Sequence, residues 1–170
     1  NFSRSECLIV ASQDNTEIEI IPSVTTWGGH LAGIPYMITL DAGETYQLKS
    51  NATTADLTGT KITGSLQSGS CRPFAVFGGA ECANVPTSCT TCDHLFDQQF
   101  PIYAWGTEYY MPPFQTTGVY TYRVLALNNG TQVSVDGGAP QNLGAGQIIE
   151  VKNEINPKQI TSNQTGRAHD

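Results

Sequence analysis

The residues most suited to chemistry lie in one stretch, 82–101, which reads CANVPTSCTTCDHLFDQQFP. It brings Cys82, Cys89, Cys92 and His94 close together in the chain. Thiolates and an imidazole could bind zinc, a Cys-x-x-Cys pair could carry out thiol redox chemistry, and cysteines in a loop could close it by disulfides. These alternatives need different surroundings, so the compartment and the elements that position this stretch decide between them.

The composition indicates an extracellular protein. Only 14% of the 170 residues are charged and five are cysteines, which is more typical of secreted and cell-surface proteins than of cytosolic enzymes. The net charge of −7, with eight Lys and Arg in all, is unsuited to neutralising the phosphates of nucleic acid or of an anionic membrane. No apolar run approaches the length of a membrane-spanning helix. We therefore expect a secreted or cell-surface location, no nucleic-acid partner and no membrane span.

Sequons for N-linked glycosylation, Asn-x-Ser/Thr, occur at Asn51, Asn129 and Asn163, as well as at Asn1. The Asn129-Gly-Thr sequon has the sequence of a tight turn, which would expose the asparagine side chain. Because sequons are short, chance also supplies some of them. A glycoprotein with sugars at these positions and an unmodified protein with polar turn residues are both open interpretations.

Short runs of apolar and polar residues, several of them alternating and separated by Gly, Asn, Asp and Pro, predict β-strands through most of the chain. The runs are TEIEIIP at 16–22, YMITL at 36–40, ETYQLK at 44–49, FAVFGG at 74–79, YTYRVLAL at 120–127, TQVSVDG at 131–137 and QIIEVK at 147–152. Only residues 92–100, CDHLFDQQF, could form a helix, of about two turns. The pattern favours an all-β protein built from antiparallel sandwich-like units.

Comparison of the chain with itself reveals two related segments. Residues 8–20 align without gaps on residues 123–135, and residues 40–49 align on 143–152. The triplet KIT at Lys61 is echoed by QIT further along the chain. Matches in the same order are what a duplicated β unit leaves behind.

We therefore predict two β units: residues 1–101, which contain the cysteine-rich loop, and residues 102–170, which are incomplete at the C-terminal end. Each unit lacks a strand that the other has. One interpretation is that the chain is a piece of a longer repeat protein, and the other is that each unit has an open sheet edge. Open edges are templates for strand addition. An alternative function is therefore a subunit of an extracellular filament, assembled by strand exchange between neighbouring copies.

Four ordered motifs carry a family resemblance. They are DLTGTKIT at 56–63, PFAVFGGAEC at 73–82, CDHLFDQQFP at 92–101 and WGTEY at 105–109. With them the chain resembles the N-terminal domain of the IgG Fc-binding protein family, which includes a mucus glycoprotein and bacterial surface relatives. The strong match covers about residues 55–112, and weaker similarity extends to both ends.

The resemblance implies an extracellular, β-rich module without known catalysis, in which Cys82 and Cys92 form a disulfide that closes the loop. The sequence departs from the family pattern by adding Cys89 and by having Cys71 and Cys7 elsewhere. Sequence alone does not fix the pairing of these three, which allow one further disulfide. We predict Cys71 with Cys89 in preference to Cys7 with Cys71.

Catalytic alternatives have little support in the residues. Cys82, Cys89, Cys92 and His94 are enough ligands for zinc, but an oxidising compartment favours disulfides, and no second Cys-x-x-Cys or histidine pair supports a structural zinc site. Thioredoxin-like chemistry would need alternating strands and helices. The chain has no Gly-x-Ser-x-Gly motif, and its three histidines lack an evident nucleophile nearby. We expect no enzyme activity, no metal and no cofactor. His94 is expected to bond to backbone groups and to anchor the loop together with Asp97 and Gln98.

The longer loop of the first unit, SVTTWGGHLAGIP at 23–35, is the best candidate for a recognition surface, because loops on a rigid sandwich commonly carry binding. Trp27 and His30 are its candidate binding residues. We therefore predict a non-catalytic adhesion or structural module of a cell-surface or mucus-type protein. Its partners would be a protein or glycan ligand, and possible self-association follows from the filament alternative.

Overall fold

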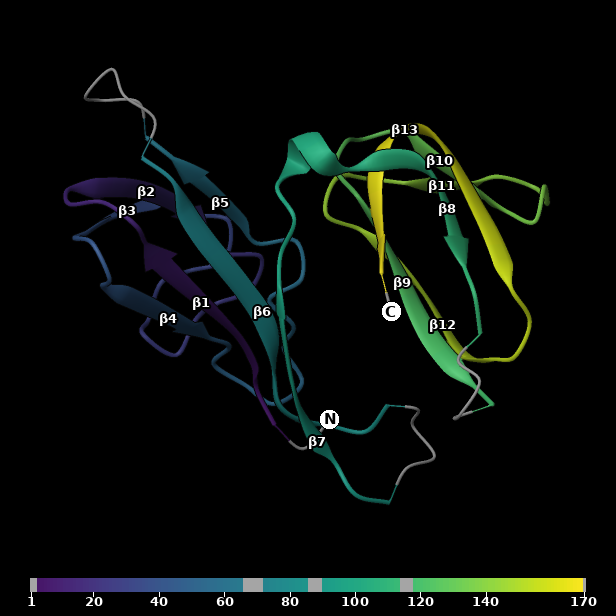
Figure 1. The fold of residues 1–170 in the computed structure, drawn as a ribbon, viewed down its shortest axis with the longest axis horizontal. Coiled ribbons are helices and arrows are strands. Elements are labelled where there is room, and N and C mark those ends of the chain that lie inside the picture. Colours follow the sequence, from purple (N-terminus) through teal and green to yellow (C-terminus); the bar gives the residue numbers. More distant parts are fainter. Residues whose placement is uncertain (1–2, 66–71, 86–89, 114–117, 170) are drawn as a thin grey trace. The chain divides into compact units, whose positions relative to one another are not determined.

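The computed structural model describes residues 3–65, 72–85, 90–113 and 118–169, with the side chains of 165–169 left out. The chain divides into two compact units, one of Asn1–Ala83 with Cys92–Gln99 and one of Asn84–Thr91 with Phe100–Asp170. Both are built from antiparallel strands (Figure 1), and the described residues contain no α-helix, only one short 3-10 turn. The prediction of an all-β protein is confirmed.

The first unit consists of two sheets. Its strands are β1 (Ser5–Ala11), β2 (Thr16–Ile21), β3 (Tyr36–Leu40), β4 (Thr45–Lys49), β5 (Lys61–Gly64), β6 (Phe74–Ala83) and β7 (Asp93–Gln98). One sheet has the order β4-β1-β6-β7 and the other the order β3-β2-β5. Chain connections therefore cross from one sheet to the other between β1 and β2, as in a sandwich.

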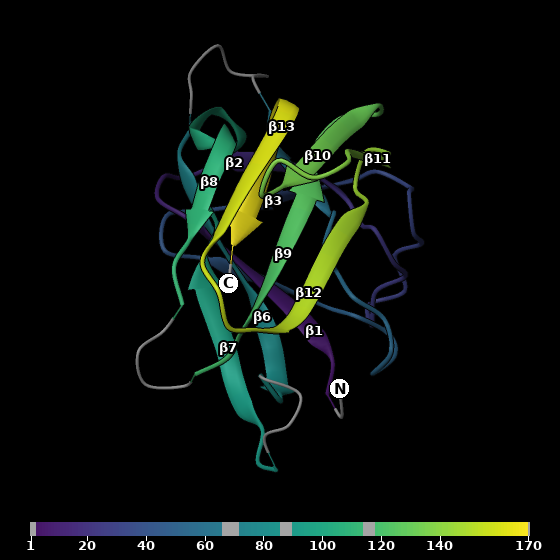
Figure 2. The same cartoon turned by 90° about the vertical axis from the view of Figure 1, so that its right-hand side faces the viewer.

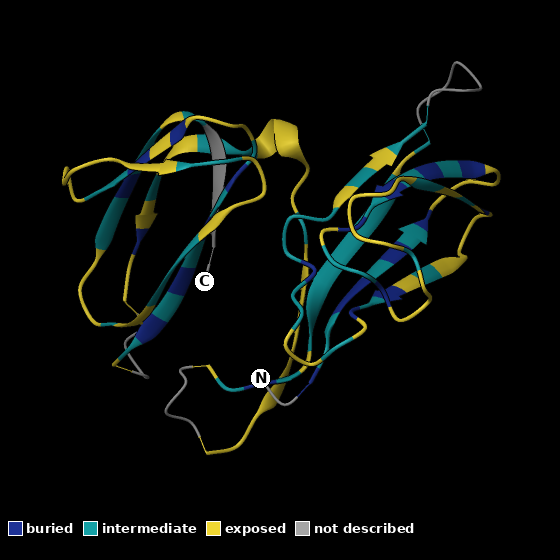
Figure 3. Cartoon of the chain, turned by 180° about the vertical axis from the view of Figure 1, so that it is seen from behind, coloured by how far each residue is buried: buried dark blue, intermediate teal, exposed yellow. Residues whose placement is uncertain are grey.

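The core of the first unit follows from the alternation that the sequence shows. Ile18 and Ile20 of β2 are fully buried, while Glu17 and Glu19 between them are only partly buried. Ile9 of β1 is likewise fully buried, and it belongs to the same apolar cluster as the β2 isoleucines. Figure 3 shows this banding of buried and less buried residues along the strands. Side chains of both sheets thus form one core.

The second unit has one six-stranded hydrogen-bonded network. Its elements are η1 (Ile102–Ala104), β8 (Gly106–Met111), β9 (Tyr120–Ala126), β10 (Thr131–Val135), β11 (Gln141–Leu143), β12 (Ile148–Glu154) and β13 (Lys158–His169). The order is β11-β10-β13-β9-β12, and β8 also pairs with β13. The first part of β13 pairs with β10 and β8, whereas residues 166–169 pair with β9 (Figure 2). One long strand therefore serves both halves of the network.

The two units share the same strand pairing at aligned positions. The pairing of β1 with β4 matches that of β9 with β12, and the pairing of β2 with β5 matches that of β10 with β13. Corresponding pairs are Ile9↔Tyr46 and Val124↔Ile149, Thr16↔Leu40 and Thr131↔Leu143, Ile18↔Gly64 and Val133↔Ser162, and Ile20↔Ile62 and Val135↔Ile160. Descent of the two units from a duplication stays a prediction that this shared register supports.

Corresponding turns are held by the same bonds. The amide of Ala42 donates to Asp14 Oδ1 at 3.0 Å, and the amide of Ala145 donates to Asn129 Oδ1 at 2.9 Å. Both turns have a glycine at positive φ after the alanine, at +81° and +76°. The Ala-Gly turn needs that glycine because other residues rarely adopt such a φ.

β7 is a strand and not the short helix that residues 92–100 could have formed. It lies at the edge of its sheet, antiparallel to β6. A close approach holds it there: a β-carbon added to Gly79 of β6 would lie 1.8 Å from the carbonyl oxygen of Leu95. Pairing with β6 satisfies the β7 backbone groups that face β6 and fixes the segment as a strand.

Candidate functional site

The loop between β2 and β3 is held by its own backbone bonds. Thr26 makes two hydrogen bonds within the loop. Its amide donates to the His30 carbonyl at 2.9 Å, and the His30 amide donates to Thr26 Oγ1 at 3.1 Å. Thr26 is buried and also forms a β-bridge with Ser50. The Gly33 amide closes the loop by donating to the Pro22 carbonyl at 2.8 Å. The loop therefore presents its side chains on a fixed backbone.

Trp27 projects from this loop into solvent. Its side chain is 66% exposed, while its backbone amide donates to the Lys49 carbonyl at 2.8 Å. The guanidinium carbon of Arg4 lies 4.3 Å from the centre of the indole ring. A cation over an indole face is attracted by the ring quadrupole, so Arg4 restrains the ring in an exposed orientation.

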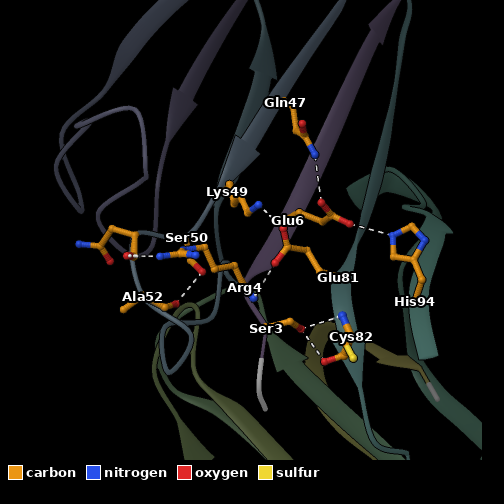
Figure 4. A network of polar contacts seen from close by, with 11 residues as sticks. Ser3, Arg4, Glu6, Gln47, Lys49, Ser50, Ala52, Glu81, Cys82 and His94 are labelled. Carbon is orange, nitrogen blue, oxygen red and sulfur yellow. Dashed lines mark hydrogen bonds and ion pairs between the residues drawn. The ribbon is translucent and has the colours of Figure 1, made fainter. Parts of the chain in front are cut away.

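Arg4 connects Trp27 to a network of charged and polar groups on the β4-β1-β6-β7 sheet (Figure 4). The Arg4 amide donates to Glu81 Oε2 at 3.3 Å, and its guanidinium reaches the Asn51 carbonyl at 3.5 Å. Glu81 forms an ion pair with Lys49. The bond from Lys49, and then that from the Arg4 amide, hold the pKa of Glu81 below its ordinary value. Arg4 thus connects the exposed tryptophan to a network that holds charges of both signs.

The same loop carries two further exposed apolar residues. Leu31 is 61% exposed and Ile34 is 57% exposed. We refer to Arg4, Trp27, Leu31 and Ile34 as the Trp27 surface. The sequence pointed to Trp27 but not to Leu31 or Ile34, and it gave no signal for Arg4, which lies on another part of the chain.

His30, the second predicted binding residue, is half-buried. Its ring stacks on Tyr36 with centroids 3.6 Å apart and planes 6° from parallel, and its Nε2 lies 3.4 Å from the Tyr46 hydroxyl. Burial, and next a hydrogen bond with Tyr46, raise the pKa of Tyr36 above its ordinary range. In this structure His30 packs the loop against Tyr36 of β3 and Tyr46 of β4.

The cysteine-rich stretch contains the disulfide between Cys82 and Cys92, with Cα atoms 5.2 Å apart. Ser3 joins this disulfide to the chain ahead of β1: the Cys82 amide donates to Ser3 Oγ at 2.7 Å, and Ser3 Oγ donates to the Cys82 carbonyl at 2.5 Å (Figure 4). Cys71 and Cys89, the second predicted pair, lie outside the described residues. Cys7 is a buried free thiol, and burial raises its pKa to about 12.

His94 lies on β7 and contacts a side chain, not the backbone groups that we expected. Its Nε2 is 2.7 Å from Glu6 Oε1, and the other Glu6 oxygen accepts a bond from Gln47 at 3.0 Å (Figure 4). Glu6 is buried, which explains why it needs these partners. Within the described ranges no group of three His, Cys, Asp or Glu side chains is arranged to hold a metal.

All three sequon asparagines within the described residues, Asn51, Asn129 and Asn163, are exposed. Two of them already make structural bonds: Asn129 accepts from the Ala145 amide, and Asn163 Oδ1 accepts from the Gln132 amide at 2.7 Å. Asn51 makes its bonds through the backbone, including the contact from Arg4. Attachment of sugars at these positions stays a prediction.

Comparison with known proteins shows the family to which this chain belongs. A model of the family described as IgGFc binding protein matches residues 1–166. The chain belongs to the IgGFc-binding protein family. The IgGFc-binding protein of Homo sapiens is 28% identical to it over 158 residues, which is 89% of this chain and 3% of that relative. No solved structure matches the chain.

The resemblance drawn from the four motifs is therefore confirmed, and the structure gives these motifs of the IgGFc-binding family physical roles. Asp56 accepts bonds from the amide and hydroxyl of Thr58 at 2.9 and 2.7 Å, which forms the turn ahead of β5. Leu57 of the same motif is buried. Among the residues that the structure covers, no helix is long and apolar enough to pass through a membrane.

Proposed function

We propose that this chain is an extracellular, non-catalytic binding module that holds a protein ligand on the Trp27 surface. The single observation that carries the proposal is the exposed indole of Trp27, fixed on an ordered loop and stacked beneath an arginine. Trp and Arg are the residue types that most often dominate binding energy at protein interfaces. The Arg4 guanidinium holds the Trp27 indole in one orientation, which lowers the entropy cost of covering it with a ligand.

The surroundings of Trp27 suit a protein ligand. Leu31 and Ile34 supply apolar contact, whereas the Lys49–Glu81 pair supplies a charged rim. Interfaces commonly combine an apolar centre with a polar border. An exposed indole also stacks on sugars, so a glycan ligand is the alternative that the binding experiment has to distinguish.

An extracellular setting fits the disulfide between Cys82 and Cys92, because such bonds persist mainly in oxidising compartments. We further propose that the protein is of the cell-surface or mucus type and that its exposed sequons carry sugars. Intact mass before and after reduction and enzymatic deglycosylation tests these points together. Failure of the mass to change with either treatment would contradict them.

The human relative is named for binding IgG Fc, which makes Fc the first protein probe to test. Binding of immobilised human IgG Fc to the chain is measured by biolayer interferometry, with an Fc-free mucin glycan surface as the second probe. We expect Trp27→Ala to weaken Fc binding by at least about tenfold, as for a hot-spot residue. Tyr103→Ala is the matched control, because Tyr103 is an exposed aromatic (91%) in the other unit.

Equal Fc binding by Trp27→Ala and the unsubstituted chain would refute the Trp27 surface as the site. Binding only to the mucin surface would favour the glycan alternative. The filament alternative stays a prediction, and sedimentation velocity across a range of concentrations tests it.

A further inference from the structure

The outer edge of β5 differs from the corresponding edge in the second unit. Among the described residues, β5 pairs only with β2 and ends the order β3-β2-β5. Its counterpart, the first part of β13, pairs with β10 on one side and with β8 on the other. The second unit therefore covers an edge that the described part of the first unit leaves open.

The backbone groups of β5 that face this edge can be assigned from the pairing with β2. The Ser65 amide donates to the Glu17 carbonyl at 2.8 Å, so odd-numbered residues of β5 face β2. Backbone direction alternates along a strand, and the amides and carbonyls of Ile62 and Gly64 therefore face outward. In β13 the residue corresponding to Ile62 is Ile160, which pairs with Tyr109 of β8.

The corresponding residues Ile160 and Ile62 also differ in burial, and Ile62 is the more exposed of the two. Ile160 is only 1% exposed, and it shares its core cluster with Met111 and Tyr109 of β8. Ile62 packs against the first core but is only partly buried. No described strand of the first unit pairs with β5 at the place that β8 takes beside Ile160.

The charge on the outer edge of β5 also indicates which side chains a pairing segment would carry. In the second unit, Gln159 Nε2 donates to Glu108 of β8 at 2.6 Å. The residue of β5 at the position of Gln159 is Lys61, which is exposed. An acidic side chain at the position of Glu108 would therefore meet an opposite charge on β5.

We propose that the outer edge of β5 is a strand-acceptor site for an extended segment of the β8 type, joined ahead of β1 in the same polypeptide. Such a segment runs antiparallel to β5, with apolar residues at the positions of Tyr109 and Met111 covering Ile62. It has an acidic residue at the position of Glu108. In the second unit β8 lies directly ahead of β9, the counterpart of β1, so a segment ahead of β1 has the shortest route to this edge.

The test fuses a copy of residues 105–115 directly ahead of Asn1. This spacing reproduces that of β8 to β9, because Ser5 corresponds to Tyr120 in the alignment of the units. The control is the same fusion with proline in place of the copied Tyr109, which removes a strand donor without changing length. Amide hydrogen exchange is followed at Ile62 and Gly64.

We expect the fusion to slow exchange of the Ile62 and Gly64 amides at least about tenfold relative to the proline control, and to leave Thr63, which already faces β2, much less affected. Unchanged exchange at Ile160 in the second unit confirms that all variants are folded. A thermal midpoint several degrees above that of the control is expected as well.

Equal exchange at Ile62 and Gly64 in the fusion and the proline control would overturn the proposal. Protection of these amides that rises with concentration in the unfused chain would also overturn it, since the occupant would then be a second copy of the chain. Neither result depends on Fc binding, so the proposed function and the acceptor site fail or stand separately.

Discussion

Substitution of Gly79 by alanine tests how closely β7 lies on β6. The added β-carbon would lie 1.8 Å from the Leu95 carbonyl oxygen, 2.7 Å from its carbonyl carbon and 3.1 Å from the Phe96 Cα. All three are backbone atoms of the neighbouring strand, which have no rotamer to change. The two strands must therefore separate.

The size of the effect follows from these distances. A carbon and a carbonyl oxygen approach to about 3.3 Å at the closest, so β7 must move away by about 1.5 Å. That displacement takes strand hydrogen bonds of about 2.9 Å well beyond 3.5 Å. Two lost bonds at about 0.5 to 1.5 kcal/mol each, with overpacking of about 1 to 3 kcal/mol, give an expected loss of about 2 to 6 kcal/mol.

Gly78→Ala is the matched control one residue away. Its added β-carbon would meet the amide end of the Gln99 side chain at 3.1 Å, and that end can move. Neither glycine has a positive φ, so backbone strain does not distinguish the two sites. We expect a loss below about 1 kcal/mol, because only a side chain has to adjust.

The free energy of unfolding of both variants is measured by urea titration, and exchange of the β7 amides is followed by mass spectrometry. The expected result is a large loss and fast β7 exchange for Gly79→Ala alone. If the two variants lose the same stability to within about 0.5 kcal/mol, contact with Leu95 is not the reason for glycine at this position.

Three further outcomes can be checked on the same protein. Replacing Cys82 and Cys92 by serine should lower the free energy of unfolding by about 2 to 3 kcal/mol, because the unfolded chain is then no longer restricted by the closed loop. Reduction of the unsubstituted chain should reproduce this loss, and an effect smaller than about 0.5 kcal/mol would contradict the prediction. Because the folded pKa of Glu81 is lowered, chiefly by Lys49, its contribution is present above the unfolded pKa and is lost as the pH falls through the folded value. Glu81→Gln should therefore lose less stability than the unsubstituted chain between pH 5 and pH 3 in urea titrations. Cys7, with its pKa raised by burial to about 12, should resist a thiol reagent at pH 8 until urea unfolds the chain, and rapid labelling without urea would refute its burial.

The fold class could be predicted because alternation survives in the strands that build the cores. Residues 16–22 show buried and half-buried positions in turn, and the structure has β2 there with that pattern. Residues 93–98 could not be assigned in the same way, because all of β7 is exposed and no buried face imposes a period of two on its sequence. Its strand state comes from pairing with β6.

The family motifs indicated which residues matter but not which contacts require them. Gly79 is the second of two glycines in the motif at 73–82, and it is required there by the close approach of the Leu95 carbonyl, which the sequence does not reveal. Trp27 could be chosen from its loop, whereas Arg4 could not, because their contact joins distant parts of the chain. Contacts of that kind depend on strand order, and one sequence does not determine strand order.

The two units differ in where the chain stops pairing with one strand and begins pairing with the next. The first unit does so between Gly64 and Phe74, where β5 ends and β6 begins. The second makes the same passage inside β13, between Thr161 and Gly166. An inserted peptide tag or cleavage site at this point of β13 displaces the register of a strand shared by β10 and β9. Sequence of variable length therefore cannot be added there without rebuilding the sheet.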